Sequence, residues 1–182
     1  MTASLVLTVI GDDRPGLVES VSEVVEGHGG NWLESRMARL SGKFAGIVQI
    51  EVSAAESARL ERALGELCSR GLHVVVESAG DPGPGLDQRG WHRLTLDVVG
   101  QDRPGIVKSI SHVLAERGVN VEELDTDRRS APMSGQMLFH AKARLRLPPE
   151  VSLDELHGAL ERVAADLMVD LRLLDATTPT PS

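Results

Sequence analysis

The first hydrophobic segment of the chain, SLVLTVI at residues 4–10, is rich in β-branched residues and alternates imperfectly between apolar and polar positions. This pattern predicts a strand that is buried on at least one face. The sequence GDDRPG that follows ends the strand. We expect a helix to begin at Pro15, because proline fixes φ and fits the first helical turn. The apolar positions of this helix recur every three or four residues: Leu17, Val18, Val21, Val24 and Val25.

Two further patterns complete a unit of about 78 residues. Extended segments at residues 31–40 and 44–52 flank the turn SGK and predict an antiparallel hairpin. Residues 53–71 then carry apolar positions at helical spacing and end in glycine, and LHVVVE at residues 72–77 predicts a closing strand. The order βαββαβ predicts an α+β fold of the ferredoxin-like type, with two helices on one face of a four-stranded sheet.

The same pattern occurs a second time. The segment GDDRPGLVESVSEVVEGHGGN at residues 11–31 resembles GQDRPGIVKSISHVLAERGVN at residues 100–120, an offset of 89 positions (100 − 11). The chain is therefore an internal duplication, and each copy is predicted to form one domain. At this offset the second copy repeats these residues of the first copy: Gly11, Asp13, Arg14, Pro15, Gly16, Val18, Ser20, Ser22, Val24, Gly29, Asn31 and Glu34.

The copies differ in length after Asn120. Ala63 and Leu64 match Ala159 and Leu160 at an offset of 96, so the second copy has about seven more residues (96 − 89). We expect them in the hairpin or before the second helix, because insertions are tolerated in loops. A capping box is predicted where Ser152 precedes Glu155.

Composition changes suggest where the domains end. The Gly/Pro-rich stretch at residues 79–90 is predicted to be a linker. The first domain is then expected at residues 1–78 and the second at residues 91–176. Residues 177–182, TTPTPS, are expected to be a disordered tail.

Charge and composition exclude several classes of partner. A net charge of −8 and a pI near 5.2 argue against a nucleic-acid partner, because binding to the phosphate backbone needs clustered Lys and Arg. Two Trp, two Phe and no Tyr also leave few aromatic platforms for stacking bases. The single cysteine, Cys68, cannot form a disulfide within the chain and is expected to pack on a helix as a small apolar residue. With no spanning-length apolar stretch and no signal-peptide pattern, we expect a cytoplasmic protein without a membrane partner.

Known catalytic spacings are missing from the sequence. The six histidines show neither H-x-x-x-H nor H-E-x-x-H spacing, so no metal site is predicted. The phosphate-binding, dinucleotide-binding and nucleophile-elbow motifs do not occur either, so we expect no cofactor and no enzymatic activity.

The repeated loop has a chemistry suited to a zwitterion. The start of the expected helix presents free N–H groups and the positive end of its dipole, which can bind a carboxylate, and Gly16 has no side chain to block close approach. Asp13 could accept hydrogen bonds from an ammonium group, and Asn31 can donate and accept. The alternative is that these residues are ordinary helix punctuation, since Pro-Gly at a helix start and Asn after a turn are common. Duplication does not decide between the two.

The pattern G-x-D-R-P-G, followed by an amphipathic helix and by G-x-N at the next strand, resembles the ACT domain, a regulatory module that senses amino acids. The resemblance covers nearly the whole chain, twice. It implies that a ligand lies between two domains, and that the domains pack side by side into a shared antiparallel sheet with the helices on one face. The candidate ligand-binding residues that it implies are Asp13, Arg14, Pro15, Gly16 and Asn31 in the first copy, and Asp102, Arg103, Pro104, Gly105 and Asn120 in the second.

The copies also depart from each other near these positions: Asp12 becomes Gln101, Gly30 becomes Val119 and Trp32 becomes Val121. If only one copy binds a ligand, these differences would be the first place to look for the reason.

Two ACT-like domains without a catalytic domain imply a non-enzymatic, amino-acid-sensing regulator, here of transcription in amino-acid metabolism. We expect a small amino acid as ligand, with glycine or serine the first candidates. The expected protein partner is a regulator such as a DNA-binding activator, with no direct contact to nucleic acid. The alternative is a ligand-free module that regulates or scaffolds a metabolic enzyme. A homodimer is expected because open sheets leave edge strands that proteins usually cover.

Overall fold

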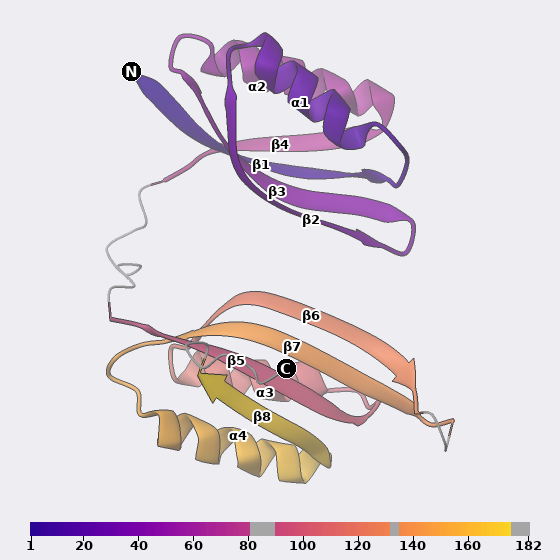
Figure 1. The fold of residues 1–182 in the computed structure, drawn as a ribbon, viewed down its shortest axis with the longest axis vertical. Helices are drawn as coiled ribbons and strands as arrows, with labels where there is room; N and C mark the ends of the chain where they lie inside the picture. Colours follow the sequence, from indigo (N-terminus) through magenta and orange to yellow (C-terminus); the bar gives the residue numbers. More distant parts are fainter. Residues whose placement is uncertain (81–89, 132–134, 176–182) are drawn as a thin grey trace. The chain divides into compact units, whose positions relative to one another are not determined.

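The computed structural model describes residues 1–80, 90–131 and 135–175. They belong to two compact units, Met1–Gly85 and Leu86–Ser182, each with its own sheet and helices (Figure 1). Most of the predicted linker at residues 79–90 and all of the predicted tail at residues 177–182 lie outside the described residues. The predicted domain limits therefore stay predictions.

The first unit has the order βαββαβ. Its four strands form one antiparallel sheet in the order β2-β3-β1-β4, and both helices cover the same face of it (Figure 1). A short 3-10 turn, Leu67–Arg70, continues the second helix. The elements are β1 (Thr2–Asp12), α1 (Leu17–Gly27), β2 (Asn31–Leu40), β3 (Lys43–Ser53), α2 (Ser57–Glu66) and β4 (Leu72–Ser78).

The second unit repeats this architecture, with the strand order β6-β7-β5-β8. The predicted α+β class and the two ferredoxin-like βαββαβ units are confirmed. The paired strands lie within two sheets of four, and a shared eight-stranded sheet stays a prediction. The elements are β5 (His92–Gln101), α3 (Ile106–Glu116), β6 (Asn120–Ser130), β7 (Met137–Leu147), α4 (Leu153–Leu167) and β8 (Val169–Asp175).

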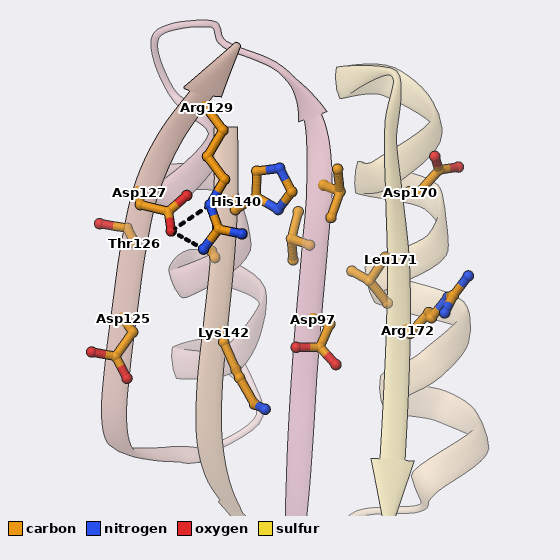
Figure 2. Close-up of a pocket in the computed structure, with 13 residues that line it drawn as sticks. Asp97, Asp125, Thr126, Asp127, Arg129, His140, Lys142, Asp170, Leu171 and Arg172 are labelled. Atoms are coloured by element: carbon orange, nitrogen blue, oxygen red, sulfur yellow. Dashed lines mark hydrogen bonds and ion pairs between the residues drawn. The ribbon is translucent and has the colours of Figure 1, made fainter. Parts of the chain in front are cut away.

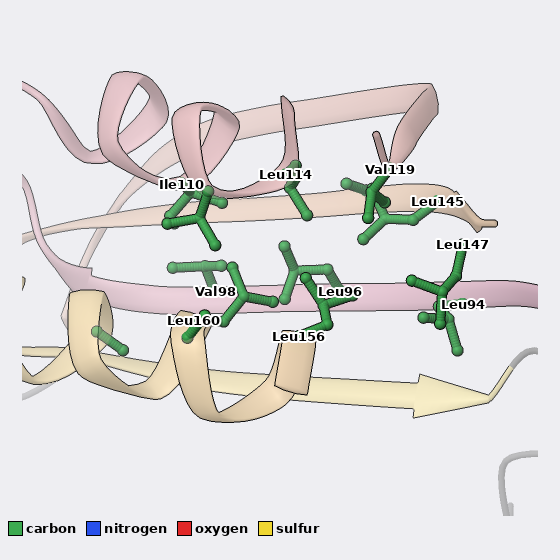
Figure 3. Packing of buried hydrophobic residues seen from close by; sticks show 14 of the residues in the cluster. Leu94, Leu96, Val98, Ile110, Leu114, Val119, Leu145, Leu147, Leu156 and Leu160 are labelled. Atoms are coloured by element: carbon green, nitrogen blue, oxygen red, sulfur yellow. The ribbon is translucent and has the colours of Figure 1, made fainter. Parts of the chain in front are cut away.

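Each unit has its own aliphatic core between the sheet and the helices. In the first unit Leu7, Ile50, Leu60 and Leu64 are completely buried. Figure 3 shows the corresponding layer of the second unit, where leucines of β5, β7 and α4 interlock with α3. Burial of one such side chain stabilises the fold by about 1.5–3 kcal/mol, so the alternating strands and amphipathic helices follow directly from the apolar pattern.

The helices begin later than predicted. Helix α1 begins at Leu17 and not at Pro15, because Gly16 adopts a left-handed conformation with φ of 88°. Gly105 does the same before α3, with φ of 97°. A left-handed residue cannot belong to a right-handed helix, so the Pro-Gly pair forms a turn that precedes each helix.

The capping box predicted at Ser152 is not formed. Ser152 does stand at the N-cap of α4, as the sequence predicted, but its side chain makes no capping hydrogen bond. Its backbone carbonyl accepts the first helical bond, from Leu156 N–H at 3.1 Å. The position of the helix start was therefore correct and the mechanism was wrong.

Most of the extra residues of the second copy lie in its hairpin. Leu7 pairs with Val48 in the first sheet, and the equivalent Leu96 pairs with Ala143, so the offset has grown to 95 (143 − 48) at this point. Six of the seven residues (95 − 89) therefore precede β7, and one precedes the next helix.

The edge strand of each hairpin, β2 in the first unit and β6 in the second, has a shift in its pairing register at equivalent residues. The register shifts between Trp32 and Glu34 in β2, and between Val121 and Glu123 in β6. Such a shift is the mark of a β-bulge, which bends the strand and increases its local twist.

The first glycine of each repeated loop has a packing role. A Cβ atom on Gly11 would lie 2.8 Å from the carbonyl oxygen of Gly71, and one on Gly100 would lie 2.4 Å from Cγ1 of Val169. Any side chain here would collide with the neighbouring strand, which explains the glycine without reference to a ligand.

Candidate functional site

The repeated loop of the first unit is fixed to the hairpin between β2 and β3. The backbone N–H of Asp13 donates to the carbonyl of Gly42 at 2.9 Å. Its carboxylate forms an ion pair with Arg39 near the end of β2, with 2.6 Å between Oδ2 and Nε. The neighbouring Asp12 pairs with Lys43 at the start of β3. Two aspartates thus hold the loop from both strands of the hairpin.

The loop of the second unit is held in the same way at one of these two points. The backbone N–H of Asp102 donates to the carbonyl of Met137 at 3.0 Å. Its carboxylate pairs with Arg128 of β6, with 2.7 Å between Oδ2 and Nε. Gln101 replaces Asp12, so the second tether is lost.

Sequence reasoning missed the two arginines. Arg39 and Arg128 were not among the predicted site residues, although they stand 89 positions apart (128 − 39), the same offset as the loop. The shared offset was the one indication in the sequence that the two arginines are equivalent. It did not identify them as site residues, because only the folded hairpin brings the end of β2 or β6 beside the loop.

The arginines within the loops do not share a role. Arg14 donates from Nη2 to the backbone carbonyl of Arg70 at 2.5 Å, which joins the loop to the end of the second helix. Arg103 donates from Nη2 to Oε1 of its neighbour Gln101 at 2.9 Å. The two loops therefore share the Asp–Arg pair and the backbone hydrogen bond of the same aspartate, whereas their arginines make different contacts.

The two helix starts offer similar backbone donors. Gly16 accepts two hydrogen bonds from Ser20, from its N–H at 2.9 Å and from its hydroxyl at 2.8 Å. Neither α1 nor α3 has a side-chain N-cap. The first amides of each helix have no acceptor within the helix, and the helix dipole favours a negative group in front of them. Both starts can therefore receive a carboxylate.

Asn31 lies away from the rest of its predicted site. It opens β2 opposite Glu51, whose partner in β1 is Ser4, whereas Asp13 follows the other end of β1. Helix α1 connects the two places, and its 11 residues span about 16 Å. Asn120 begins β6 after α3 in the same way. Each unit brings together its Asp, Arg, Pro and Gly, and a single unit does not bring the asparagine to them.

The electrostatics of the first loop are those of a solvent-exposed site. The hydrogen bond from Lys43, together with its positive charge, holds the pKa of Asp12 below its usual value. Lys43 and Asp12 are both largely exposed, so the pair orders the loop more than it stabilises the fold.

A hollow of about 990 Å³ lies on the sheet face of the second unit that points away from the helices (Figure 2). Charged side chains from all four strands line it, among them Asp97, Asp125, Lys142 and Arg172. The ten predicted site residues do not line it, and sequence reasoning did not predict it. The available signal was the sequence of β7, in which His140, Lys142, Arg144 and Arg146 alternate with apolar residues.

A second, apolar hollow lies beside α3. It is lined by core residues and by Val107, Val121 and Leu124, which are 40–49% exposed. In the first unit the residue equivalent to Val121 is Trp32, which packs against the core. The exchange of Trp32 for Val121 thus removes a large side chain from between the helix and the edge strand.

Cys68 is exposed, and the prediction that it packs as an apolar residue was wrong. It lies in the 3-10 turn after α2, with Sγ 3.3 Å from Nδ1 of His73. The change from an α-helix to a 3-10 turn alters the residue spacing and turns this position toward solvent.

In the described ranges no three His, Cys, Asp or Glu side chains gather in a group that could hold a metal ion. Within the same ranges, no helix has the length and apolar character needed to cross a membrane.

Comparison with known proteins gives matches along almost the whole chain. The sequence model of the ACT domain matches residues 3–77 and again residues 92–173. The glycine cleavage system transcriptional repressor of Escherichia coli (strain K12) is 24% identical over 167 residues, which cover 90% of this chain and 85% of that protein.

Two crystal structures resemble the chain over its length. An unknown protein from Galdieria sulphuraria is 32% identical, with a TM-score of 0.81 over 97% of this chain and 100% of that one. A protein assigned provisionally as a glycine cleavage system transcriptional repressor is 23% identical, with a TM-score of 0.69 over 95% of this chain and 96% of that one. The second likeness concerns the fold alone.

Proposed function

The chain belongs to the ACT domain family, and we propose that it is a non-enzymatic regulatory protein that senses a small amino acid. In this proposal it regulates transcription of glycine cleavage or of related amino-acid metabolism, through a protein partner such as a DNA-binding activator. The similarity to the repressor of Escherichia coli, along 85% of that protein, supports the regulatory role. The chain's acidity supports an indirect one, because an activator could supply the contacts to DNA.

The observation that carries the sensing role is the Asp–Arg pair at the start of both helices. Asp13 pairs with Arg39 and Asp102 with Arg128 in the same geometry, while the loop arginines Arg14 and Arg103 make different contacts. The arginines of both pairs are largely exposed, and an ion pair at the surface commonly contributes only about 0–1 kcal/mol to stability. Because the stability of the fold does not depend strongly on this pair, the aspartate can exchange its arginine for a ligand at little cost to the fold.

An amino acid would fit this arrangement through both of its charges. Its carboxylate would accept hydrogen bonds from the first amides of the helix, which lie beyond Gly16 or Gly105. Its ammonium group would compete with the arginine for the aspartate carboxylate. Asn31 and Asn120 stay candidates only for a ligand that is also contacted by a second domain or a second copy of the chain.

A ligand-free interaction module is the second candidate function, and the position of Asn31 favours it. The asparagine and the aspartate that were expected to share a ligand lie at opposite ends of α1. The aspartates are also already neutralised by arginine. In this case the chain would regulate or scaffold a metabolic enzyme by surface contacts alone.

Thermal unfolding in the presence of each of the twenty amino acids tests between the two functions. A ligand at 100 times its dissociation constant stabilises the folded state by about 2.7 kcal/mol, enough to raise the melting temperature by several degrees. We expect one or a few small amino acids, glycine and serine first, to give such a shift. Calorimetry with the same amino acid then measures affinity and stoichiometry.

Variants of the loops identify the working copy. Asp13→Asn and Asp102→Asn should each remove binding in one unit, whereas the matched control Glu61→Gln, which removes an exposed carboxylate of α2 outside the loop, should leave it intact. If no amino acid shifts the melting temperature, sensing is excluded and the ligand-free module stands. Tight, sequence-selective binding of DNA by the pure protein would contradict the indirect role.

A further inference from the structure

The outer face of the second sheet carries a row of alternating charges that crosses all four strands (Figure 2). Asp125 of β6 pairs in register with Lys142 of β7, Lys142 with Asp97 of β5, and Asp97 with Arg172 of β8. The charges across the sheet are therefore negative, positive, negative and positive, at the strand spacing of about 4.8 Å.

These four charged side chains form no ion pairs with one another or with their neighbours in the described part of the chain. Each of them is without an ion pair or a side-chain hydrogen bond in the part of the chain that the structure describes. Their neighbours on the same face differ in this respect, since Glu123 pairs with Arg144 and Asp127 with Arg129. The row thus offers four unpaired charged groups to a partner that covers this face.

The row is not a general feature of the fold. The equivalent positions of the first sheet, found by the same strand register, are Arg36, Ile47, Thr8 and Val75. Only one of these four residues is charged. The alternation therefore belongs to the sequence of the second unit.

A row with the signs −+−+ is complementary to itself when it is turned end for end. We propose that this face is an interface between two copies of the chain, related by a two-fold axis that runs parallel to the strands. Rotation about that axis places Asp125 opposite Arg172 of the second copy, and Lys142 opposite Asp97 of the second copy. Symmetry repeats both pairs, so each of the eight charges in the two rows meets an opposite one.

The charge pattern selects this arrangement over the other face-to-face arrangement. A two-fold axis across the strands would place each residue opposite its own copy, so that every charge in the row would meet a like charge. In the adjacent row, the proposed axis would place Asp127 opposite Asp170 of the second copy, but Asp127 is already paired with Arg129, with 3.0 Å between Oδ2 and Nε. The proposal concerns assembly and does not depend on amino-acid sensing.

The decisive experiment uses two charge-reversed variants of the full chain, Lys142→Glu and Asp97→Lys, in sedimentation velocity at low ionic strength. We expect the wild type to dimerise, and raised salt to weaken the dimer because the contact depends on charge. Each variant alone should be monomeric, because position 142 of one copy then faces a like charge at position 97 of the other. A mixture of the two variants should dimerise, since the glutamate introduced at position 142 of one chain meets the lysine introduced at position 97 of the other, and the other three pairs are unchanged.

The mixture separates contacts between copies from contacts within one sheet, because mixing changes nothing inside either chain. Circular dichroism of each variant checks that it is folded, and Lys108→Glu, a charge reversal on exposed α3, is the matched control that should dimerise like the wild type. A monomeric wild type, single variants that still dimerise, or a mixture that stays monomeric would each overturn the proposal. If the wild type is monomeric, this face of the sheet would be available to bind a different protein.

Discussion

Asp102 and Arg128 form an ion pair, with 2.7 Å between the carboxylate Oδ2 and the guanidinium Nε, that joins the loop after β5 to the edge strand β6. The side chain of Arg128 is 61% exposed and that of Asp102 is 28% exposed. The pair therefore fixes the direction of a carboxylate in front of a helix without being a main source of stability.

Substitution of Arg128 should affect ligand affinity more than the stability of the fold. We expect Arg128→Met to change the free energy of unfolding by less than about 1 kcal/mol, because exposed ion pairs contribute little. Affinity for a bound amino acid should change measurably, since the ligand's ammonium group would no longer compete with the guanidinium. Urea unfolding and calorimetry measure the two quantities. A variant that loses several kcal/mol of stability would show that the pair is structural.

A methyl group on Gly100 should be strongly destabilising. Its carbon would lie 2.4 Å from Cγ1 of Val169, so β5 and β8 would have to separate. We expect Gly100→Ala to cost about 2 kcal/mol or more in urea unfolding, in the range of overpacked cores. The control is Gly158→Ala in α4, where there is space and alanine should stabilise the helix by up to about 1 kcal/mol. Equal stability of the two variants would contradict the packing role of Gly100.

Trp32 should contribute more to its unit than Val121 does to the other. Trp32→Val removes an aromatic ring that packs against the first core, and we expect a loss of about 1–3 kcal/mol. Val121 is 40% exposed, so Val121→Ala should cost less than about 1 kcal/mol. Thermal unfolding of the two variants compares them. A larger loss at Val121 would mean that the apolar hollow beside α3 is covered in solution.

The pair of Asp12 and Lys43 should be visible in a pH titration. Because Lys43 lowers the pKa of Asp12 in the folded state, the pair stabilises the fold above the unfolded pKa, and this contribution is lost as the pH falls through the lowered pKa. Lys43→Met should raise the pKa of Asp12 toward its ordinary value, as followed by carboxyl NMR chemical shifts. An unchanged Asp12 titration in this variant would show that the pair does not form in solution.

The sequence predicted the elements well because each leaves a period in the apolar positions. Leu5, Leu7 and Val9 alternate along β1, and Leu17, Val21 and Val25 follow the helical spacing of α1, so burial alone indicates both. The duplication strengthened the assignment of each helix and strand, because the same apolar pattern occurs in both copies. The left-handed glycines were harder to place, since Pro-Gly fits a helix start and a turn equally well.

The candidate site was predicted less completely, because its geometry depends on contacts between distant segments. Asn31 follows the loop by fewer than about twenty positions, yet α1 carries it to the far end of the sheet. Arg39 is still further along the sequence, and the hairpin returns it to Asp13. The outer face of the second sheet needed the strand register, which the apolar pattern alone does not fix to the residue.

The paired irregularities in β2 and β6 have a consequence for the behaviour of the chain at high concentration. An edge strand with regular, unpaired backbone groups is a template for unlimited strand addition, which leads to aggregates and fibrils. A bulge at Leu33 and its counterpart Glu122 interrupts that template near the start of each strand. The bulges would thus allow the edges to remain open for a specific partner while they protect the folded protein from polymerisation.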